Sequence, residues 1–344
     1  MNRYIVTIFF LLQLAAVGDS FSQGRTDSKQ QFASLGNFAL ENGQQIVDCK
    51  IGYRTFGKLN EQKTNAIIYL TSGGTTTYMM QLFGMGREVD TTKFYLILID
   101  GLGNGVSSSP SNSVAQPATS FPQFSIRDMV NSEYQMLNEK LGIHHINAVV
   151  GGSLGGLQAL QWAVSYPEFM DKIVAIETTP KISAYDALWM TTFTEAVKND
   201  TGYHDGHYTK NPPLAVATHL SQLVLMTPER FNASFSADSL FKLFAMLEQN
   251  PFKVDANNIL WQTKAVLMHD ITSKFGGSME NTAKAIKAKM LIVANKQDHN
   301  INQTLAIAFA KTAKAELVEM DNNLGHLIFG EKVVIEATRK FLAQ

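Results

Sequence analysis

Residues 149–160 read Val-Val-Gly-Gly-Ser-Leu-Gly-Gly-Leu-Gln-Ala-Leu and contain the pattern Gly-x-Ser-x-Gly, with Ser153 at its centre. A mostly apolar run, residues 146–150, precedes the pattern, and helix-forming residues follow it from 157 to 163. A strand, a sharp turn and a helix form the context in which this pattern presents a nucleophilic serine. Gly151 and Gly155 leave room for the strained turn, because a Cβ atom there would clash. We predict that Ser153 is a nucleophile; the alternative is a glycine-rich strand-to-helix turn of another α/β fold.

Short apolar runs alternate with helical patterns on both sides of Ser153. The runs that we expect to be strands are residues 66–70, 94–99, 146–150, 172–176, 290–295 and 316–320, and the helical patterns cover residues 126–141, 304–312 and 332–342. Upstream, after a polar lead-in over residues 23–31, two further strands are expected at 38–40 and 46–55, joined by the turn signal Asn42-Gly43. Alternating strands and helices indicate an α/β fold whose mostly parallel sheet is flanked by helices.

The pattern changes between residues 183 and 278. Strand-like runs disappear there, and helical segments rich in Met, Phe and Leu take over, such as residues 214–226 and 239–247. We expect these apolar residues to pack a lid against the core rather than to bind a cofactor, and no cofactor is predicted. The expected organisation is a core of residues 36–180 and 281–344 with a helical lid inserted over residues 181–280.

Composition narrows the class of protein. The chain has 344 residues, of which 45% are hydrophobic and 17% charged, as in an ordinary globular protein. Its net charge of −1 gives no indication of nucleic-acid binding or of attraction to an acidic membrane surface. A single cysteine, Cys49, excludes an internal disulfide and a cysteine-rich metal site. Because Cys49 lies among strand-like residues, we expect a buried structural thiol.

Residues 1–22 have the pattern of a secretory signal peptide. Arg3 supplies positive charge, residues 4–17 form a short apolar run, and Ser20 and Ser22 provide small residues before a cleavage site at Gln23. The run is short and interrupted for a membrane span, which favours a cleaved signal peptide. The alternative is an uncleaved anchor helix. The sequence therefore predicts an exported protein, periplasmic or extracellular.

Two residues in the C-terminal part are the expected partners of Ser153. A serine hydroxyl is a weak nucleophile until a base removes its proton, and an acid must fix the tautomer of that base. With this type of turn the chain order is serine, acid, histidine, each after a strand. Asp298 follows the expected strand 290–295, and His326 follows the strand 316–320. Because parallel strands share one carboxyl edge, both should lie on the same side as Ser153.

The oxyanion of such a reaction needs two backbone donors. One is expected to be the N–H of Leu154, the residue after the nucleophile. The other is expected from the loop that follows an earlier strand, residues 71–74, where Thr71 is the predicted donor.

Other titratable residues offer alternatives. Glu177, after the strand that follows Ser153, is the best second candidate for the acid. Asp321 precedes His326 on the same loop, and His299 is too close in sequence to Asp298 to face it. Residues 203–208, Tyr-His-Asp-Gly-His-Tyr, allow a metal site or a solvated polar turn; we favour the turn and predict no metal.

Four stretches together resemble the homoserine O-acetyltransferase family of the α/β-hydrolase superfamily. The nucleophile motif covers residues 151–163, and the other three stretches are residues 51–60, 105–110 and 121–130. The resemblance covers most of residues 36–180 and, more weakly, 281–344. It implies an α/β-hydrolase core, an inserted helical lid, a Ser153/Asp298/His326 triad and an acyl-enzyme intermediate. It also suggests a homodimer formed through the lid.

The chain departs from that family in features that recognise the substrate. Family members typically have an aspartate after the catalytic histidine, whereas Leu327 follows His326 here. Their lid has an arginine for the carboxylate of the amino acid, but residues 189–197 contain none, and Arg230 is the only arginine between Asp128 and Thr338. Their donor, acetyl-CoA, is a cytoplasmic metabolite. We therefore expect a hydrolase acting on a small acyl substrate. The alternatives are an O-acyltransferase and a non-catalytic binding protein on the same fold.

Overall fold

The computed structural model describes residues 28–72, 79–80, 87–249 and 254–344. The predicted signal peptide, residues 1–22, lies outside these ranges. Within them, one sheet contains eight strands in the order β1-β2-β4-β3-β5-β6-β7-β8. The strands are β1 (Gln31–Ala39), β2 (Gln45–Phe56), β3 (Ala66–Leu70), β4 (Tyr95–Ile99), β5 (Ile146–Gly152), β6 (Met170–Ile176), β7 (Lys289–Asn295) and β8 (Glu316–Met320).

Strands β3 to β8 are mutually parallel, whereas β2 pairs antiparallel with β4 and with β1. The carboxyl ends of six strands therefore meet at one edge of the sheet. The expected mostly parallel sheet flanked by helices is confirmed. The helices are α2 (Ile126–Gln135), α3 (Leu154–Ser165), α4 (Ala184–Lys198), α5 (Ala215–Leu225), α6 (Pro228–Ser234), α7 (Ala237–Gln249), α8 (Ala256–Leu267), α9 (Met279–Ala285), α10 (Thr304–Thr312) and α11 (Lys332–Leu342).

Both faces of the sheet are buried, and alternate residues of each strand contribute to opposite faces. Val149 of β5 belongs to the core under α2, α3 and α10, whereas Val150 belongs to the core under α11. Strands covered in this way read as continuous apolar runs, which is why β3 to β7 were recognisable in the sequence.

Helix α3, which begins directly after Ser153, is fixed against α2. The indole N–H of Trp162 donates to a carboxylate oxygen of Glu133 at 2.7 Å, and both side chains are buried. Burial raises the pKa of Glu133 to about 8. Ser125 caps α2 as its sequence position suggests, and it does so in a capping box with Asp128.

The N-terminal hairpin is longer than its sequence indicated. The first strand begins at Gln31 rather than Phe38, and irregular pairing occurs between Ser34 and Phe38 around Gly36, which has a φ of 67°. This irregularity breaks the alternation of polar and apolar residues that would mark the strand. The predicted turn is present, with the Gly43 N–H donating to Leu40 O at 3.0 Å.

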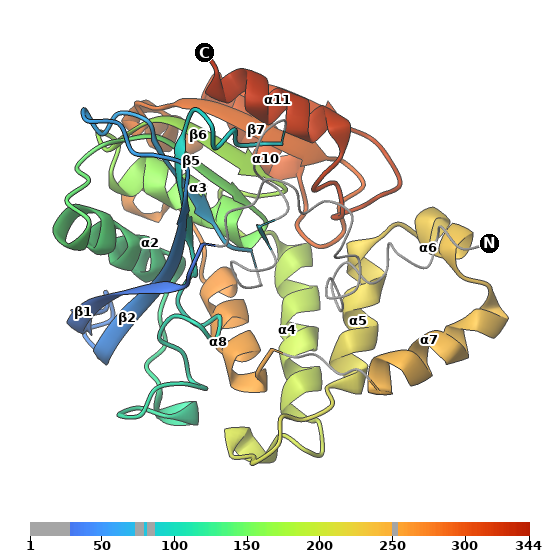
Figure 1. Ribbon diagram of the computed structural model, residues 1–344. Coiled ribbons are helices and arrows are strands. Elements are labelled where there is room, and N and C mark those ends of the chain that lie inside the picture. The colour runs from blue at the N-terminus through green and yellow to red at the C-terminus, as the bar shows by residue number, and fades with distance from the viewer. Residues whose placement is uncertain (1–27, 73–78, 81–86, 250–253) are drawn as a thin grey trace.

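The segment between β6 and β7 is helical, as predicted. Helices α4, α5 and α8 stand together beside the carboxyl edge of the sheet, and α6 and α7 extend farther from it (Figure 1). Among the described residues, no helix combines the length and apolarity that crossing a membrane requires.

Candidate active site

Ser153 occupies a strained turn between β5 and α3. Its backbone has φ 54° and ψ −124°, a combination that is unfavourable for a residue with a side chain. The Ser153 N–H donates to Ile176 O at 2.9 Å, and the Leu157 N–H donates to Ser153 O at 3.0 Å. The neighbouring strand and the first helical turn therefore hold this conformation from both sides.

Glycines make this turn sterically feasible. A Cβ atom on Gly151 would lie 2.1 Å from Gly155 O, and one on Gly155 would lie 2.4 Å from Leu70 O. A Cβ atom on Gly152 would lie 2.4 Å from the ring of Phe329. The strand, the helix and the neighbouring strand β3 thus approach one another more closely than any side chain would permit. The expectation that a Cβ atom at Gly151 or Gly155 would clash is confirmed.

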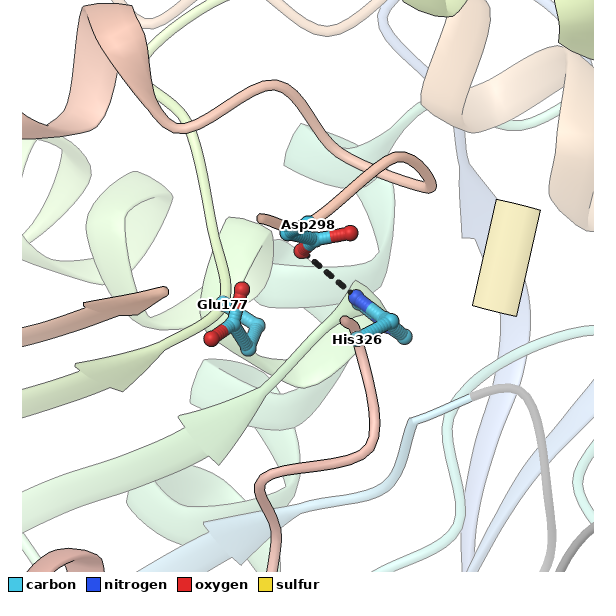
Figure 2. A group of neighbouring side chains, drawn as sticks. All are labelled: Glu177, Asp298 and His326. Atoms are coloured by element: carbon cyan, nitrogen blue, oxygen red, sulfur yellow. Dashed lines mark hydrogen bonds and ion pairs between the residues drawn. The ribbon is translucent and has the colours of Figure 1, made fainter. Parts of the chain in front are cut away.

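The structure brings Ser153, His326 and Asp298 into one chain of hydrogen bonds. His326 Nε2 lies 3.0 Å from Ser153 Oγ, and His326 Nδ1 lies 2.7 Å from Asp298 Oδ2, as Figure 2 shows for the second pair. A carboxylate only accepts hydrogen bonds, so Nδ1 carries the proton and Nε2 is free to accept from the serine hydroxyl. His326 and Asp298 are each 4% exposed, so water competes little for these bonds.

Asp298 is surrounded by hydrogen-bond donors. Its Oδ1 accepts from the backbone N–H of Asn300 at 2.7 Å and of Ile301 at 3.1 Å, and its Oδ2 also accepts from the amide of Gln303 at 3.2 Å. Burial alone would raise the pKa of Asp298, but the charge of His326, the neighbouring Glu177 carboxyl and the hydrogen bonds from His326 and Ile301 hold it below its usual value. These hydrogen-bond donors favour the ionised form of Asp298.

The alternative acids occupy other positions. Glu177 is buried beside Asp298, and its Oε1 accepts from the Asn295 N–H at 2.9 Å. Asp321 accepts from the side-chain amide of Gln297 at 2.7 Å, away from the imidazole. Asp298 is thus the carboxylate that the structure pairs with His326 Nδ1.

The remaining titratable candidates do not gather into a second site. In residues 203–208, His207 Nε2 lies 3.3 Å from Thr119 Oγ1, and His204 and Asp205 are exposed. Among the described residues, the only cluster with the spacing of metal ligands is Glu177, Asp298 and His326. Cys49 is fully buried, and burial raises the pKa of its thiol to about 12, so this thiol is unreactive.

The two backbone N–H groups predicted to bind the oxyanion, those of Leu154 and Thr71, differ in whether they already have a hydrogen-bond partner among the described residues. Leu154 occupies the first position of α3, where a backbone N–H has no partner within the helix. The Thr71 N–H instead donates to Ile99 O at 3.3 Å, continuing the pairing of β3 with β4. Because the sheet uses this N–H, Thr71 is a poor candidate for the second donor. Ser72 is described, whereas residues 73 and 74 lie outside the described ranges.

Residues 65–333 match the alpha/beta hydrolase fold family. The chain belongs to the α/β-hydrolase family. It is 31% identical over 282 residues to an ethyl acetate hydrolase of Pseudomonas veronii, and the alignment covers 78% of this chain and 80% of that protein. It is 33% identical over 295 residues to a homoserine O-acetyltransferase of Chloroherpeton thalassium, and that alignment covers 78% of this chain and 77% of that protein.

The fold is also similar to that of a solved esterase structure. An acetylester hydrolase from Corynebacterium glutamicum matches 92% of this chain and 96% of its own, with a TM-score of 0.85 and 26% identity. The resemblance to homoserine O-acetyltransferases is confirmed, and esterases are similar to the same degree. This α/β-hydrolase is therefore an enzyme, either a serine hydrolase or an acyltransferase.

The α/β-hydrolase site opens into a cavity of about 230 Å³ between the sheet edge and the helical segment. Most lining side chains are apolar, including Leu157, Trp189, Phe193, Val224, Ile259 and Val266. The polar lining residues are Ser153, Ser221, Gln262, Thr263 and Asn300. None of the described lining residues carries a charge.

Sequence reasoning missed the residues that hold the His326 loop. The side-chain amide of Asn295, at the end of β7, donates to Gly325 O at 2.8 Å and to Asn322 O at 3.1 Å. The His326 N–H donates to Leu225 O at 3.0 Å, at the end of α5. The role of Asn295 could have been expected from its position at the end of a predicted strand. The contact between His326 and Leu225 depends on tertiary packing, so no sequence pattern indicates it.

We expect Gly155→Ala to damage the site through the backbone. The added Cβ meets Leu70 O at 2.4 Å, so the start of α3 must move and carry Ser153 with it. The free energy of unfolding in urea should fall by about 1–3 kcal/mol, and labelling of Ser153 by a fluorophosphonate should slow.

Gly277→Ala is the matched control. Its Cβ meets nothing within 4 Å, but its φ of 75° is left-handed, so only a backbone cost of about 1–2 kcal/mol is expected. Labelling should stay at the wild-type rate. Equal labelling rates in the two variants would contradict the role assigned to Gly155.

Proposed function

We propose that this α/β-hydrolase hydrolyses small, uncharged carboxylic esters through an acyl-enzyme on Ser153. The observation that carries the proposal is the Ser153–His326–Asp298 hydrogen-bond chain at the base of an uncharged, mostly apolar cavity. At about 230 Å³ the cavity is smaller than the roughly 300–1,000 Å³ of typical ligand pockets, which favours a short acyl chain.

The reaction has two steps on the same residues. Ser153 Oγ attacks the carbonyl carbon while His326 Nε2 takes its proton, and the same nitrogen returns that proton to the departing alcohol as the ester C–O bond breaks. Water then attacks the acyl-enzyme and loses a proton to His326, which passes that proton to Ser153 Oγ as the bond between the acyl carbon and Oγ breaks and the acid is released. Asp298 holds the imidazole in the tautomer that both steps need and stabilises the imidazolium.

The developing oxyanion is assigned to backbone donors. The Leu154 N–H lies at the start of α3, where the helix dipole also favours negative charge. The second donor is assigned to the loop after Thr71, since the N–H of Thr71 pairs with Ile99. Each donor of this kind typically stabilises the transition state by about 3–4 kcal/mol.

Hydrolysis is favoured over transfer to an amino-acid acceptor by the chemistry of the cavity. Homoserine carries a carboxylate and an ammonium group, and burying them without partners is expensive. The described lining residues include no arginine or other charged side chain that would pair with either group. Leu327 after His326 adds an apolar residue where acetyltransferases typically have an aspartate. An O-acyltransferase is the second candidate, because such enzymes are also among the relatives.

The first test replaces the nucleophile and varies the acceptor. Ser153→Ala should reduce hydrolysis of a short-chain acyl ester by roughly 10⁶-fold, leaving only the catalysis due to binding and backbone donors. Wild-type protein should release free acid at the same rate with and without homoserine, as measured by mass spectrometry. Formation of O-acyl-homoserine at the expense of free acid would establish the transferase instead.

The second test concerns the acyl chain. Phe193 lines the cavity and packs edge-on against Trp189, with ring centroids 6.1 Å apart. Phe193→Ala should lengthen the cavity and raise the ratio of kcat/KM for butanoyl over acetyl esters by roughly tenfold or more. Phe231→Ala is the control, because this half-buried ring lies outside the cavity and its removal should leave the ratio unchanged. A parallel change in both variants would exclude a role for Phe193 in selectivity.

We also propose that the protein is exported, on the strength of the charge, apolar run and small residues in positions 1–22. Processing should leave Gln23 as the first residue. Intact-mass measurement of protein recovered from the producing cells and from their medium checks this, and a chain that retains residues 1–22 would contradict it.

A further inference from the structure

A second buried carboxyl group lies beside Asp298 and takes no part in the two steps above. Glu177 directly follows β6, is 0% exposed and has a left-handed φ of 46°, which is unfavourable for a residue with a side chain. Backbone strain and complete burial, in a residue beside Asp298 and His326, are typical of residues with a functional role.

Strand β7 holds Glu177 in one orientation. The Glu177 N–H donates to Val293 O at 2.9 Å, and its Oε1 accepts from the Asn295 N–H at 2.9 Å. Asp298 is tied to the same strand end, because its N–H donates to Asn295 O at 2.9 Å. The two carboxyl groups are thus fixed relative to each other through Asn295.

The orientation directs Glu177 toward the hydrogen-bonded pair. One ligand atom each from Glu177, Asp298 and His326 lies within 4.8 Å of the others, and Figure 2 shows the three side chains facing one another. Glu177 Oε2 is buried and has no hydrogen-bond donor among the described residues. This oxygen is where a proton on Glu177 would be placed.

Two negative charges at this distance are disfavoured, because they are buried together. Both oxygens of Asp298 already accept N–H groups, which suits the ionised form. Glu177 has one such donor on Oε1 and, among the described residues, forms no ion pair with a lysine or arginine. Burial, and then the neighbouring carboxyl of Asp298, raise the pKa of Glu177 well above its ordinary value.

We propose that Glu177 is a positioning residue, an un-ionised carboxylic acid whose Oε2–H donates to the Asp298 carboxylate. This inference rests on the proposed function, in which Asp298 orients His326. The donated hydrogen bond fixes the Asp298 carboxylate and spreads its charge, without adding a second negative charge beside the imidazole. The titratable groups that face Glu177 are Asp298 on the loop after β7 and His326 on the loop after β8; its other partners, Val293 and Asn295, are uncharged.

Two substitutions separate the un-ionised acid from the alternatives. Glu177→Gln keeps the volume, the acceptor for Asn295 N–H and an N–H donor for Asp298, with no charge. Glu177→Met keeps most of the volume but has no donor. Glu133→Gln is the matched control, because Glu133 is also a buried carboxyl with a raised pKa, of about 8, but is bonded to Trp162 in the α2–α3 contact.

The measurement is the rate at which a fluorophosphonate labels Ser153, followed by intact mass as a function of pH. Glu177→Gln and Glu133→Gln should match the wild-type rate within about twofold and keep the same acid limb. Glu177→Met should label roughly tenfold more slowly at its maximum, well short of the ~10⁴-fold loss when a triad acid is neutralised. Its acid limb should also move to higher pH by about half a unit or more. Without the hydrogen bond from Glu177, the negative charge of Asp298 is less dispersed and stabilises the His326 imidazolium more strongly, which raises the pH of the acid limb.

Two results would overturn the proposal. If Glu177 is ionised in the wild type, Glu177→Gln removes a negative charge near His326 and its acid limb moves to lower pH. If Glu177 is merely structural, Glu177→Met slows labelling equally at every pH, with no shift of the acid limb. Should Glu177→Met fail to fold, the profile of Glu177→Gln still tests whether Glu177 is un-ionised.

The labelling assay also separates this inference from the proposed function. Labelling requires an activated serine but not a particular acyl substrate. A wild-type protein that labels yet releases no acid from any short-chain ester would refute ester hydrolysis, while the pH profiles of the Glu177 variants would still establish or exclude its role. In an active enzyme, Glu177→Met should lower kcat with KM unchanged, because Glu177 is not among the cavity-lining residues.

Discussion

The close approach of three backbone segments at Ser153 is the constraint on which the site depends. Strand β5 is followed by Ser153, with φ 54° and ψ −124°, and helix α3 starts at once beside strand β3. No side chain fits between them, since a Cβ on Gly155 would lie 2.4 Å from Leu70 O. This packing directs the hydroxyl of Ser153 out of the sheet edge and leaves the first N–H groups of α3, which have no partner within the helix, beside it. The orientation of the Ser153 hydroxyl and its electrostatic surroundings therefore arise from one local arrangement.

The residues of this arrangement were predictable because their signals are local or follow from chain order. The glycine pattern at 151–155 is contiguous, and Asp298 and His326 each follow an apolar run that reads as a buried strand. The first strand was less accessible, because its pairing is irregular around Gly36. The use of the Thr71 N–H by Ile99 was also hidden, since it depends on how far the pairing of β3 with β4 extends.

Relations between distant strands were the least predictable part. Glu177 was recognisable as a carboxyl at a strand end, but its contact with β7 joins residues 118 positions apart. The contact follows from the register in which Ile176 pairs with Val293. A shift of one residue in that register would turn the alternate side chains to the opposite face. The apolar sequences of β6 and β7 are compatible with several registers, so the sequence alone does not determine which carboxyl groups meet.

The loop that carries His326 is bonded to the helices above it as well as to the sheet below. The His326 N–H reaches Leu225 O at the end of α5, and the Thr227 hydroxyl donates to Asn323 O at 2.9 Å. Gly325 passes so close to α5 that a Cβ there would lie 2.8 Å from Leu225 O. An outward swing of α5 therefore either breaks these bonds or pulls the imidazole out of line with Ser153. Because α5 also lines the cavity, the shape of the cavity and the alignment of the imidazole are mechanically coupled, so a helical segment grafted from another protein would alter both together.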